Sequence, residues 1–64
     1  MRVLRVALDV PLDRLFDYLL PEALEVQAGD RVVVPFGARQ RVGIAVTTAG
    51  GSELEPSKLK QVAR

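Results

Sequence analysis

The chain has 64 residues, of which 48% are hydrophobic and 27% charged, and its formal net charge is +1. This length excludes a second domain, and the composition fits one small globular domain. The absence of cysteine and histidine excludes a disulfide framework, a zinc finger and any catalytic site built on either residue. No apolar run approaches the ~18 residues of a membrane span, and no signal-peptide core is present, so we expect a cytoplasmic chain with no membrane partner.

The charges are unevenly distributed along the chain. Residues 1–30 carry a net charge of −3 and residues 31–64 a net charge of +4. The second half can therefore present a basic face to an anionic partner, although the solvated rim of a barrel would show the same asymmetry.

Proline and glycine interrupt the chain about every eight to twelve residues, a spacing typical of all-β barrels and sandwiches. In residues 2–9 the apolar Leu4, Val6 and Leu8 alternate with polar residues, which predicts a half-buried strand. Residues 16–20 place alternate residues on one apolar face and predict a second short strand. A helical turn over residues 13–20 is the alternative, because four apolar residues there have helical spacing: Leu12, Leu15, Phe16 and Leu19.

Residues 31–36 give the clearest strand, because three successive valines are β-branched and apolar on both faces. Pro35 cannot donate a ladder hydrogen bond, so it must lie at an edge, at a bulge or at the last pairing of the strand. A loop over residues 37–40 then leads into a second strand over residues 41–48, which completes a hairpin.

In this second strand we expect Val42, Ile44 and Val46 to face inward and the alternate residues Arg41, Gly43 and Ala45 to face outward. A glycine inside a strand indicates either a sharp bend or the close approach of another backbone, and a bend is our prediction for Gly43. In the polar tail, Leu54, Leu59 and Val62 can add a last strand or a helical turn. The elements together predict an all-β, partly open barrel of about five or six short strands.

The residues favour a binding module over an enzyme. Neither phosphate-binding glycine motif, G-x-x-x-x-G-K-[ST] or G-x-G-x-x-G, is present, and no histidine can activate a serine or threonine. Asp9, Asp13 and Asp17 recur every four residues but would diverge on a strand–turn–strand, so we do not predict a metal site.

The aromatic residues are few. Domains that bind single strands stack successive bases on several aromatic rings along a basic groove, so Phe16, Tyr18 and Phe36 cannot line a long groove. One or two of them beside a basic patch can hold one base, and the alternative is that all three lie in the core. Asp17 repels phosphate but accepts hydrogen bonds, so beside Phe16 it can recognise a strand terminus with a free hydroxyl. The alternative is a solvated acid on the outer face of the strand.

Three ordered segments and part of the tail match a known family. They are Val6-Ala7-Leu8-x-Val10-Pro11-Leu12, Phe16-Asp17-Tyr18-Leu19-Leu20-Pro21, residues 28–37 followed by Val42-Gly43-Ile44, and Leu59-Lys60-x-Val62. With them the sequence resembles the N-terminal 3′-DNA-end-binding domain of the PriA family, the primosomal helicases of bacterial replication restart. The resemblance covers essentially the whole chain.

The resemblance implies a small β-barrel, related to OB folds, that captures the 3′ end of the nascent leading strand with little preference for base. Carried over by position, it implies a pocket of Phe16, Asp17, Tyr18, Gly37 and Lys60. Asp17 would accept a hydrogen bond from the terminal nucleotide, Phe16 would pack on its base or sugar, Gly37 would let backbone approach and Lys60 would meet phosphate. Ala38 stands where the family is often basic, so Arg39 and Arg41 are possible further phosphate contacts.

The resemblance also implies that residues 1–64 form a single DNA-binding subdomain, the N-terminal fragment of an ATP-dependent 3′-to-5′ helicase. ATP, magnesium and zinc would belong to the full-length protein, and no cofactor and no enzymatic activity are expected of this fragment. Expected partners are branched or fork DNA with a free 3′ end, single-strand DNA-binding protein and other primosome proteins, at the bacterial nucleoid. The alternative is an SH3-like or OB-like protein-interaction barrel without DNA-end specificity.

Overall fold

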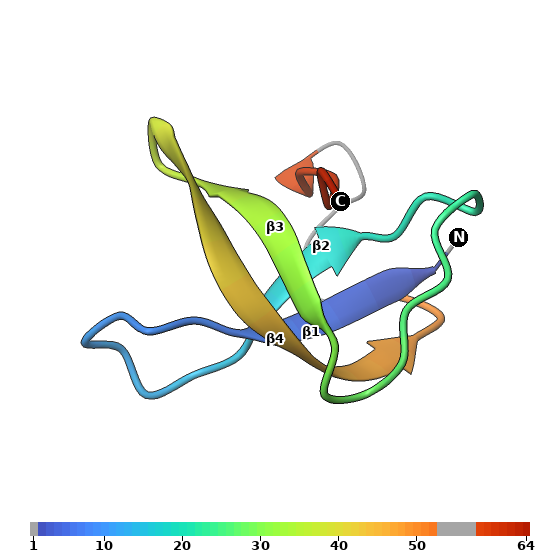
Figure 1. Cartoon of the computed structure of the whole chain (residues 1–64), viewed down its shortest axis with the longest axis horizontal. Helices are drawn as coiled ribbons and strands as arrows, with labels where there is room; N and C mark the ends of the chain where they lie inside the picture. Colours follow the sequence, from blue (N-terminus) through green and yellow to red (C-terminus); the bar gives the residue numbers. More distant parts are fainter. Residues whose placement is uncertain (1, 53–57) are drawn as a thin grey trace.

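The computed structural model describes residues 2–52 and 58–64, and over these residues the chain is built of strands without an α-helix (Figure 1). The strands β1 (Val3–Ala7), β2 (Phe16–Leu19), β3 (Arg31–Phe36) and β4 (Arg39–Ala49) form one antiparallel sheet in the order β2-β1-β4-β3. The sheet curls into a half-barrel, which confirms the all-β, partly open barrel. The described part of the chain has four strands where the sequence predicts five or six, because its tail pairs through one isolated bridge only.

The strand β1 lies in the middle of the sheet, between β2 and β4. It pairs Leu4 with Tyr18 and Val6 with Phe16, so their side chains share the inner face. Leu4, Val6 and Tyr18 belong to the buried core, against which Leu8 and Phe16 also pack. The predicted strands here are confirmed. The helical turn over residues 13–20 is wrong, because residues 16–19 are extended and pair with β1.

A hairpin joins β3 to β4 through the two residues Gly37 and Ala38. Gly37 has φ of +62°, as the first turn residue of a type II′ hairpin requires. Arg39 and Gln40 already belong to β4, opposite Phe36 and Pro35, so the loop is two residues shorter than predicted. Pro35 is the next-to-last residue of β3, which lies at one edge of the sheet. Such a position suits a residue that has no N–H to donate.

The predicted faces of β4 are wrong. Val42 is 60% exposed and Ile44 and Val46 also face outward, whereas Gly43 is buried and Ala45 only 2% exposed. The register explains the inversion, because Gly43 pairs with Val32, whose side chain lies in the core.

Atoms of β1 and of Leu8, which follows β1, fill the space beside Gly43. A Cβ on Gly43 would lie 2.7 Å from Cδ2 of Leu8 and 3.0 Å from the carbonyl oxygen of Ala7, and closer still to Val6. The pairing of β1 with β4 also shifts register between Arg5 and Val6. Gly43 therefore permits a close approach of β1, the alternative to the bend that we predicted.

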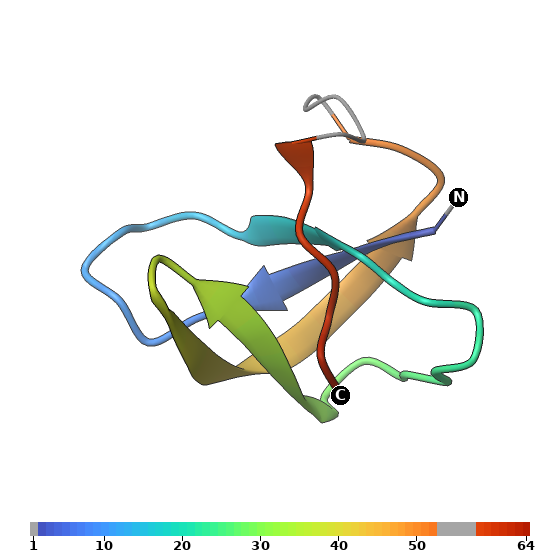
Figure 2. The same cartoon turned by 90° about the horizontal axis from the view of Figure 1, so that it is seen from above.

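The tail lies between β2 and β3, the two strands at opposite ends of the sheet (Figure 2). On one side, Leu19 N–H donates to Lys60 O at 2.9 Å and Val62 N–H to Leu19 O at 3.0 Å. On the other, Val33 N–H donates to Arg64 O at 2.6 Å and Ala63 N–H to Val33 O at 2.8 Å. Leu59 and Val62, which the sequence placed in a last strand or a helical turn, are buried, and Leu54 lies outside the described residues. The tail thus bridges the two edges of the half-barrel.

Candidate functional site

A cavity of about 190 Å³ lies where β2, the end of β3 and the tail meet. Its walls come from parts of the chain far apart in sequence: the approach to β2, β2 itself, the β3–β4 turn and the tail. The lining residues are Arg14, Phe16, Asp17, Tyr18, Pro35, Phe36, Gly37, Lys58 and Lys60. All five residues that the family resemblance implies for the site therefore border one pocket.

Tyr18 joins two walls of this pocket. Its hydroxyl donates a 2.8 Å hydrogen bond to the carbonyl oxygen of Pro35. Burial raises the pKa of the Tyr18 hydroxyl above its ordinary value. Since the side chain is almost fully buried and its hydroxyl is engaged, Tyr18 shapes the pocket.

Two phenylalanines and two arginines form a continuous set of contacts at the pocket. The rings of Phe16 and Phe36 meet edge to face, with centroids 5.3 Å apart and planes at 87°. The guanidinium of Arg14 lies over the Phe16 ring at 5.0 Å, and that of Arg41 over the Phe36 ring at 5.6 Å. Both distances fall within the range of cation–π contacts.

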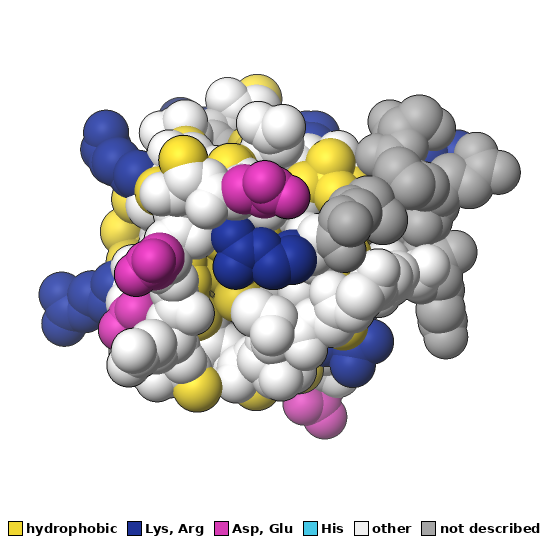
Figure 3. Space-filling model, turned by 90° about the vertical axis from the view of Figure 1, so that its right-hand side faces the viewer, with side chains coloured by type: hydrophobic (Ala, Val, Ile, Leu, Met, Phe, Trp, Pro, Cys, Tyr) yellow, Lys and Arg dark blue, Asp and Glu magenta, His cyan; other side chains and the backbone are white. Residues whose placement is uncertain are grey.

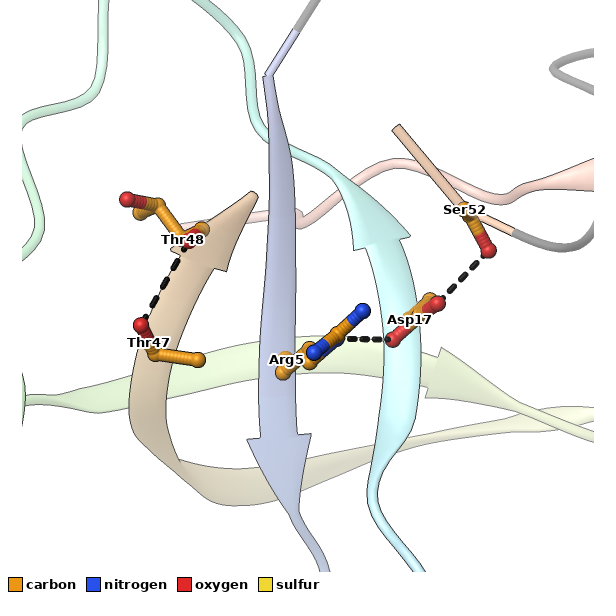
Figure 4. Close-up of polar contacts among 5 residues, drawn as sticks. All are labelled: Arg5, Asp17, Thr47, Thr48 and Ser52. Carbon is orange, nitrogen blue, oxygen red and sulfur yellow. Dashed lines mark hydrogen bonds and ion pairs between the residues drawn. The ribbon is translucent and has the colours of Figure 1, made fainter. Parts of the chain in front are cut away.

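Asp17 lines the pocket, and in β2 its side chain alternates with those of Phe16 and Tyr18. Asp17 pairs with Arg5 of β1, and the Nε atom of Arg5 lies 3.5 Å from Asp17 Oδ1. Ser52 Oγ donates a 2.6 Å hydrogen bond to Asp17 Oδ2 (Figure 4). The side chain is 20% exposed, which is less than a freely solvated acid would show. An ionised carboxylate has about four acceptor positions, so Asp17 retains capacity to accept a further hydrogen bond.

The remaining charges at the pocket are positive. Arg14, Lys58 and Lys60 line it, and Asp17 is the only acid among its described lining residues. Arg39 and Arg41 do not line it. They pair with Phe36 and Val34, which places both arginines on the hairpin face that carries Phe36.

Sequence reasoning missed four lining residues: Arg14, Pro35, Phe36 and Lys58. Strand alternation could not have found Arg14 or Lys58, because neither residue lies in a strand. Each is a cation two residues before a residue already implied for the site, Phe16 or Lys60, and this proximity is the only signal in the sequence.

A second cavity, of about 210 Å³, lies at the other end of β2 and is lined by Arg2, Leu19, Leu20, Pro21, Glu22 and Gln61. The guanidinium of Arg2 already donates hydrogen bonds to nearby backbone there, to the carbonyl oxygens of Pro21, Glu22 and Leu24 at 3.2 to 3.4 Å. On the face shown in Figure 3, acidic and basic side chains are interspersed among the described residues. The first pocket has the stronger anion-binding character, because Arg14, Lys58 and Lys60 line it, whereas the second pocket has one arginine, already hydrogen-bonded, beside Glu22.

The described residues contain no group of three or more acidic side chains that could hold a metal ion. Asp17 is engaged with Arg5 and Ser52, so it does not form a cluster with Asp9 and Asp13. Nor does any described helix have the length and apolar character needed to cross a membrane.

Comparison with known proteins places the chain in a family. The model of the PriA 3′DNA-binding domain (3′BD) matches residues 5–64. Replication restart protein PriA of Haemophilus influenzae is 47% identical over 62 residues, which are 97% of this chain and 8% of that protein. The PriA proteins of Rickettsia conorii and Bacillus subtilis are 41% and 38% identical over 64 and 53 residues, covering 97% and 80% of this chain.

The chain spans only 10% and 7% of the lengths of these last two relatives. The family match nevertheless extends over almost the whole chain, and it agrees with the prediction of a DNA-binding module. The chain therefore belongs to the PriA 3′DNA-binding domain family.

Proposed function

We propose that this domain captures the free 3′ end of a DNA strand, the nascent leading strand at a stalled or branched replication fork, so that replication can restart. The observation that carries the proposal is one pocket lined by one acidic residue, three aromatic residues and three cationic residues. The family supports DNA binding, and the names of the relatives support replication restart.

The chemistry of the pocket suits a strand end. Asp17 would accept a hydrogen bond from the terminal 3′-hydroxyl, a group that only an end possesses. Lys58 and Lys60 would neutralise the phosphate of the same nucleotide. A phosphate at the 3′ position would replace this hydroxyl, so a capped end would lack the donor that Asp17 recognises.

Gly37 provides room for the nucleotide. A Cβ built on this residue meets no atom within 4 Å, so the space beside its backbone is open to a ligand. Its positive φ also explains why glycine is needed at this turn. Phe16 provides the apolar surface of the same pocket.

The size of the pocket also favours an end over a continuous strand. Its volume, about 190 Å³, lies below the ~300–1,000 Å³ of pockets for drug-sized ligands. We infer that it holds part of one nucleotide. Arg39 and Arg41, on the adjoining hairpin face, would contact phosphates farther from the end.

Fluorescence anisotropy with a labelled primer tests this function. A primer with a free 3′-hydroxyl should bind more tightly than the same primer with a 3′-phosphate. Asp17→Ala should cost about 1–3 kcal/mol with the hydroxyl end, the size of a lost hydrogen bond to a charged group, and almost nothing with the capped end. Asp13→Ala is the matched control, because Asp13 is exposed and does not line the pocket. Equal affinity of the unmodified domain for both ends would overturn the proposal.

In the complete protein the captured end would be presented to an ATP-dependent 3′-to-5′ helicase that uses ATP, magnesium and zinc. Single-strand DNA-binding protein and other primosome proteins would act at the same fork, in the bacterial cytoplasm at the nucleoid. The alternative, a protein-interaction barrel, predicts no salt-dependent DNA binding. DNA-end capture predicts an affinity that falls with rising salt, with a shallow slope because few phosphates are contacted.

A further inference from the structure

Arg14 occupies a position that neither the family resemblance nor the sequence assigned to the site. It stands two residues before Phe16, just ahead of β2, and its amide N–H donates to the carbonyl oxygen of Leu12 at 3.0 Å. Arg14 lies at a bend before β2 begins at Phe16. It lines the same pocket as Phe16 and Tyr18.

The guanidinium of Arg14 covers the Phe16 ring. Its central carbon lies 5.0 Å from the ring centroid, and Phe36 approaches the same ring edge to face. The Phe16 ring therefore contacts both Arg14 and Phe36 at the pocket. This changes the role expected of Phe16, which becomes the support for Arg14 as well as part of the apolar wall.

Arg14 is available to a ligand. The residue is exposed, and within residues 2–52 and 58–64 its guanidinium has no hydrogen-bond or ion-pair partner. A guanidinium is planar and stacks on aromatic faces, and nucleic-acid bases stack on arginine planes as they do on aromatic rings. A base can therefore stack on this guanidinium while the guanidinium lies over the Phe16 ring.

We propose that Arg14 is the surface on which the base of the 3′-terminal nucleotide stacks, in a layered arrangement of Phe16, Arg14 and base. The inference rests on the proposed capture of a 3′ end and names the group that holds its base. Lysine at this position would keep the positive charge and lose the flat surface, since its ammonium is a compact point charge.

Arg41 supplies a matched control from the same chain. It is also exposed and lies over a phenylalanine ring, 5.6 Å from the Phe36 centroid, but it does not line the pocket. Arg14→Lys and Arg41→Lys are therefore the same chemical change, on two similar arginine–phenylalanine pairs, inside and outside the site.

The experiment compares the 64-residue chain with these two variants on three primers: an intact 3′-hydroxyl end, an end whose terminal nucleotide is abasic, and a 3′-phosphate end. The unmodified chain should bind the intact end about five- to 150-fold more tightly than the abasic end, the usual contribution of one stacked base. Arg14→Lys should reduce this ratio to less than about twofold, because it should weaken binding of the intact end far more than binding of the abasic end. Arg41→Lys should preserve the ratio.

Two results would overturn the role of Arg14. One is a base-to-abasic ratio retained in Arg14→Lys, and the other is an equal loss of affinity for both ends, which would make Arg14 a phosphate contact only. The 3′-phosphate primer separates this outcome from failure of the proposed function. If the unmodified chain distinguishes hydroxyl from phosphate ends while Arg14→Lys retains the ratio, only the stacking role fails; if it binds both ends equally, end capture fails.

Discussion

The hydroxyl of Tyr18 donates a 2.8 Å hydrogen bond to the carbonyl oxygen of Pro35 and so joins β2 to β3, the strands at opposite ends of the sheet. Both residues line the pocket. The bond therefore fixes one side of the binding site and also helps to hold the half-barrel in its curled shape. Phe16 and Phe36, two positions from Tyr18 and one from Pro35, make the second contact between the same strands.

We predict that Tyr18→Phe destabilises the domain by about 1 kcal/mol. The substitution keeps the buried ring and removes one hydrogen bond, which leaves the Pro35 carbonyl without its donor. Urea unfolding followed by circular dichroism measures the change in the free energy of unfolding. Thr47→Val is the control, because Thr47 is exposed near the end of β4. It should change stability by less than about 0.5 kcal/mol. A Tyr18→Phe variant as stable as the parent would contradict the structural role of this bond.

We also predict that stability falls at alkaline pH through Tyr18. Burial raises the pKa of its hydroxyl in the folded state above the ordinary value of 10.0, so above pH 10 the folded state holds a proton that the unfolded state has lost. This contribution is fully present below pH 10 and is lost as the pH rises through the folded-state pKa. Since the chain has one tyrosine and no tryptophan, tyrosinate absorbance follows Tyr18 alone. A midpoint at or below the ordinary value would refute the prediction.

The strands could be predicted well from the sequence, because they are determined by the local alternation of apolar and polar residues and by the prolines and glycines that end each run. Residues 31–36 needed only three valines and the turn at Gly37. The family motif in the sequence also identified five residues that the fold brings to one pocket.

The orientation of β4 could not be predicted in the same way. Val42, Ile44 and Val46 form the more apolar of its two alternating faces, yet they lie outside. The inner face carries Gly43 and Ala45 because the core there is already filled by side chains of Val6 and Leu8. Hydrophobicity along one strand contains no information about how much space its neighbours leave, so a small residue can be the buried one.

We predict that Gly43→Ala destabilises the domain by about 1–3 kcal/mol, the usual cost of forcing an extra carbon into a packed core. The new Cβ would meet Val6 and Leu8 at distances that require them to move. Gly50→Ala is the control, because a Cβ there meets nothing within 4 Å. Combining Gly43→Ala with Leu8→Ala should cost less than the sum of the two single changes, since Leu8→Ala vacates the contested space. Additive losses in urea unfolding would show that Gly43 is not required by this contact.

The bridging tail leads to the last prediction, that Val62→Ala opens the barrel between β2 and β3. Val62 is 3% exposed, and removing two buried carbons costs about 2 kcal/mol once the cavity is included. A domain of this size has little stability to lose. The neighbouring residue Gln61 is exposed, so Gln61→Ala is the control and should leave stability nearly unchanged.

Hydrogen exchange shows where the Val62→Ala variant opens. The amides of Leu19 and Val33 donate to the tail carbonyls of Lys60 and Arg64, so both should exchange faster in the variant than amides that pair β1 with β4. DNA affinity should fall together with this protection, because Lys58 and Lys60 reach the pocket from the same segment. If the Leu19 and Val33 amides keep their protection while DNA affinity falls, the tail acts on DNA directly and not by closing the barrel.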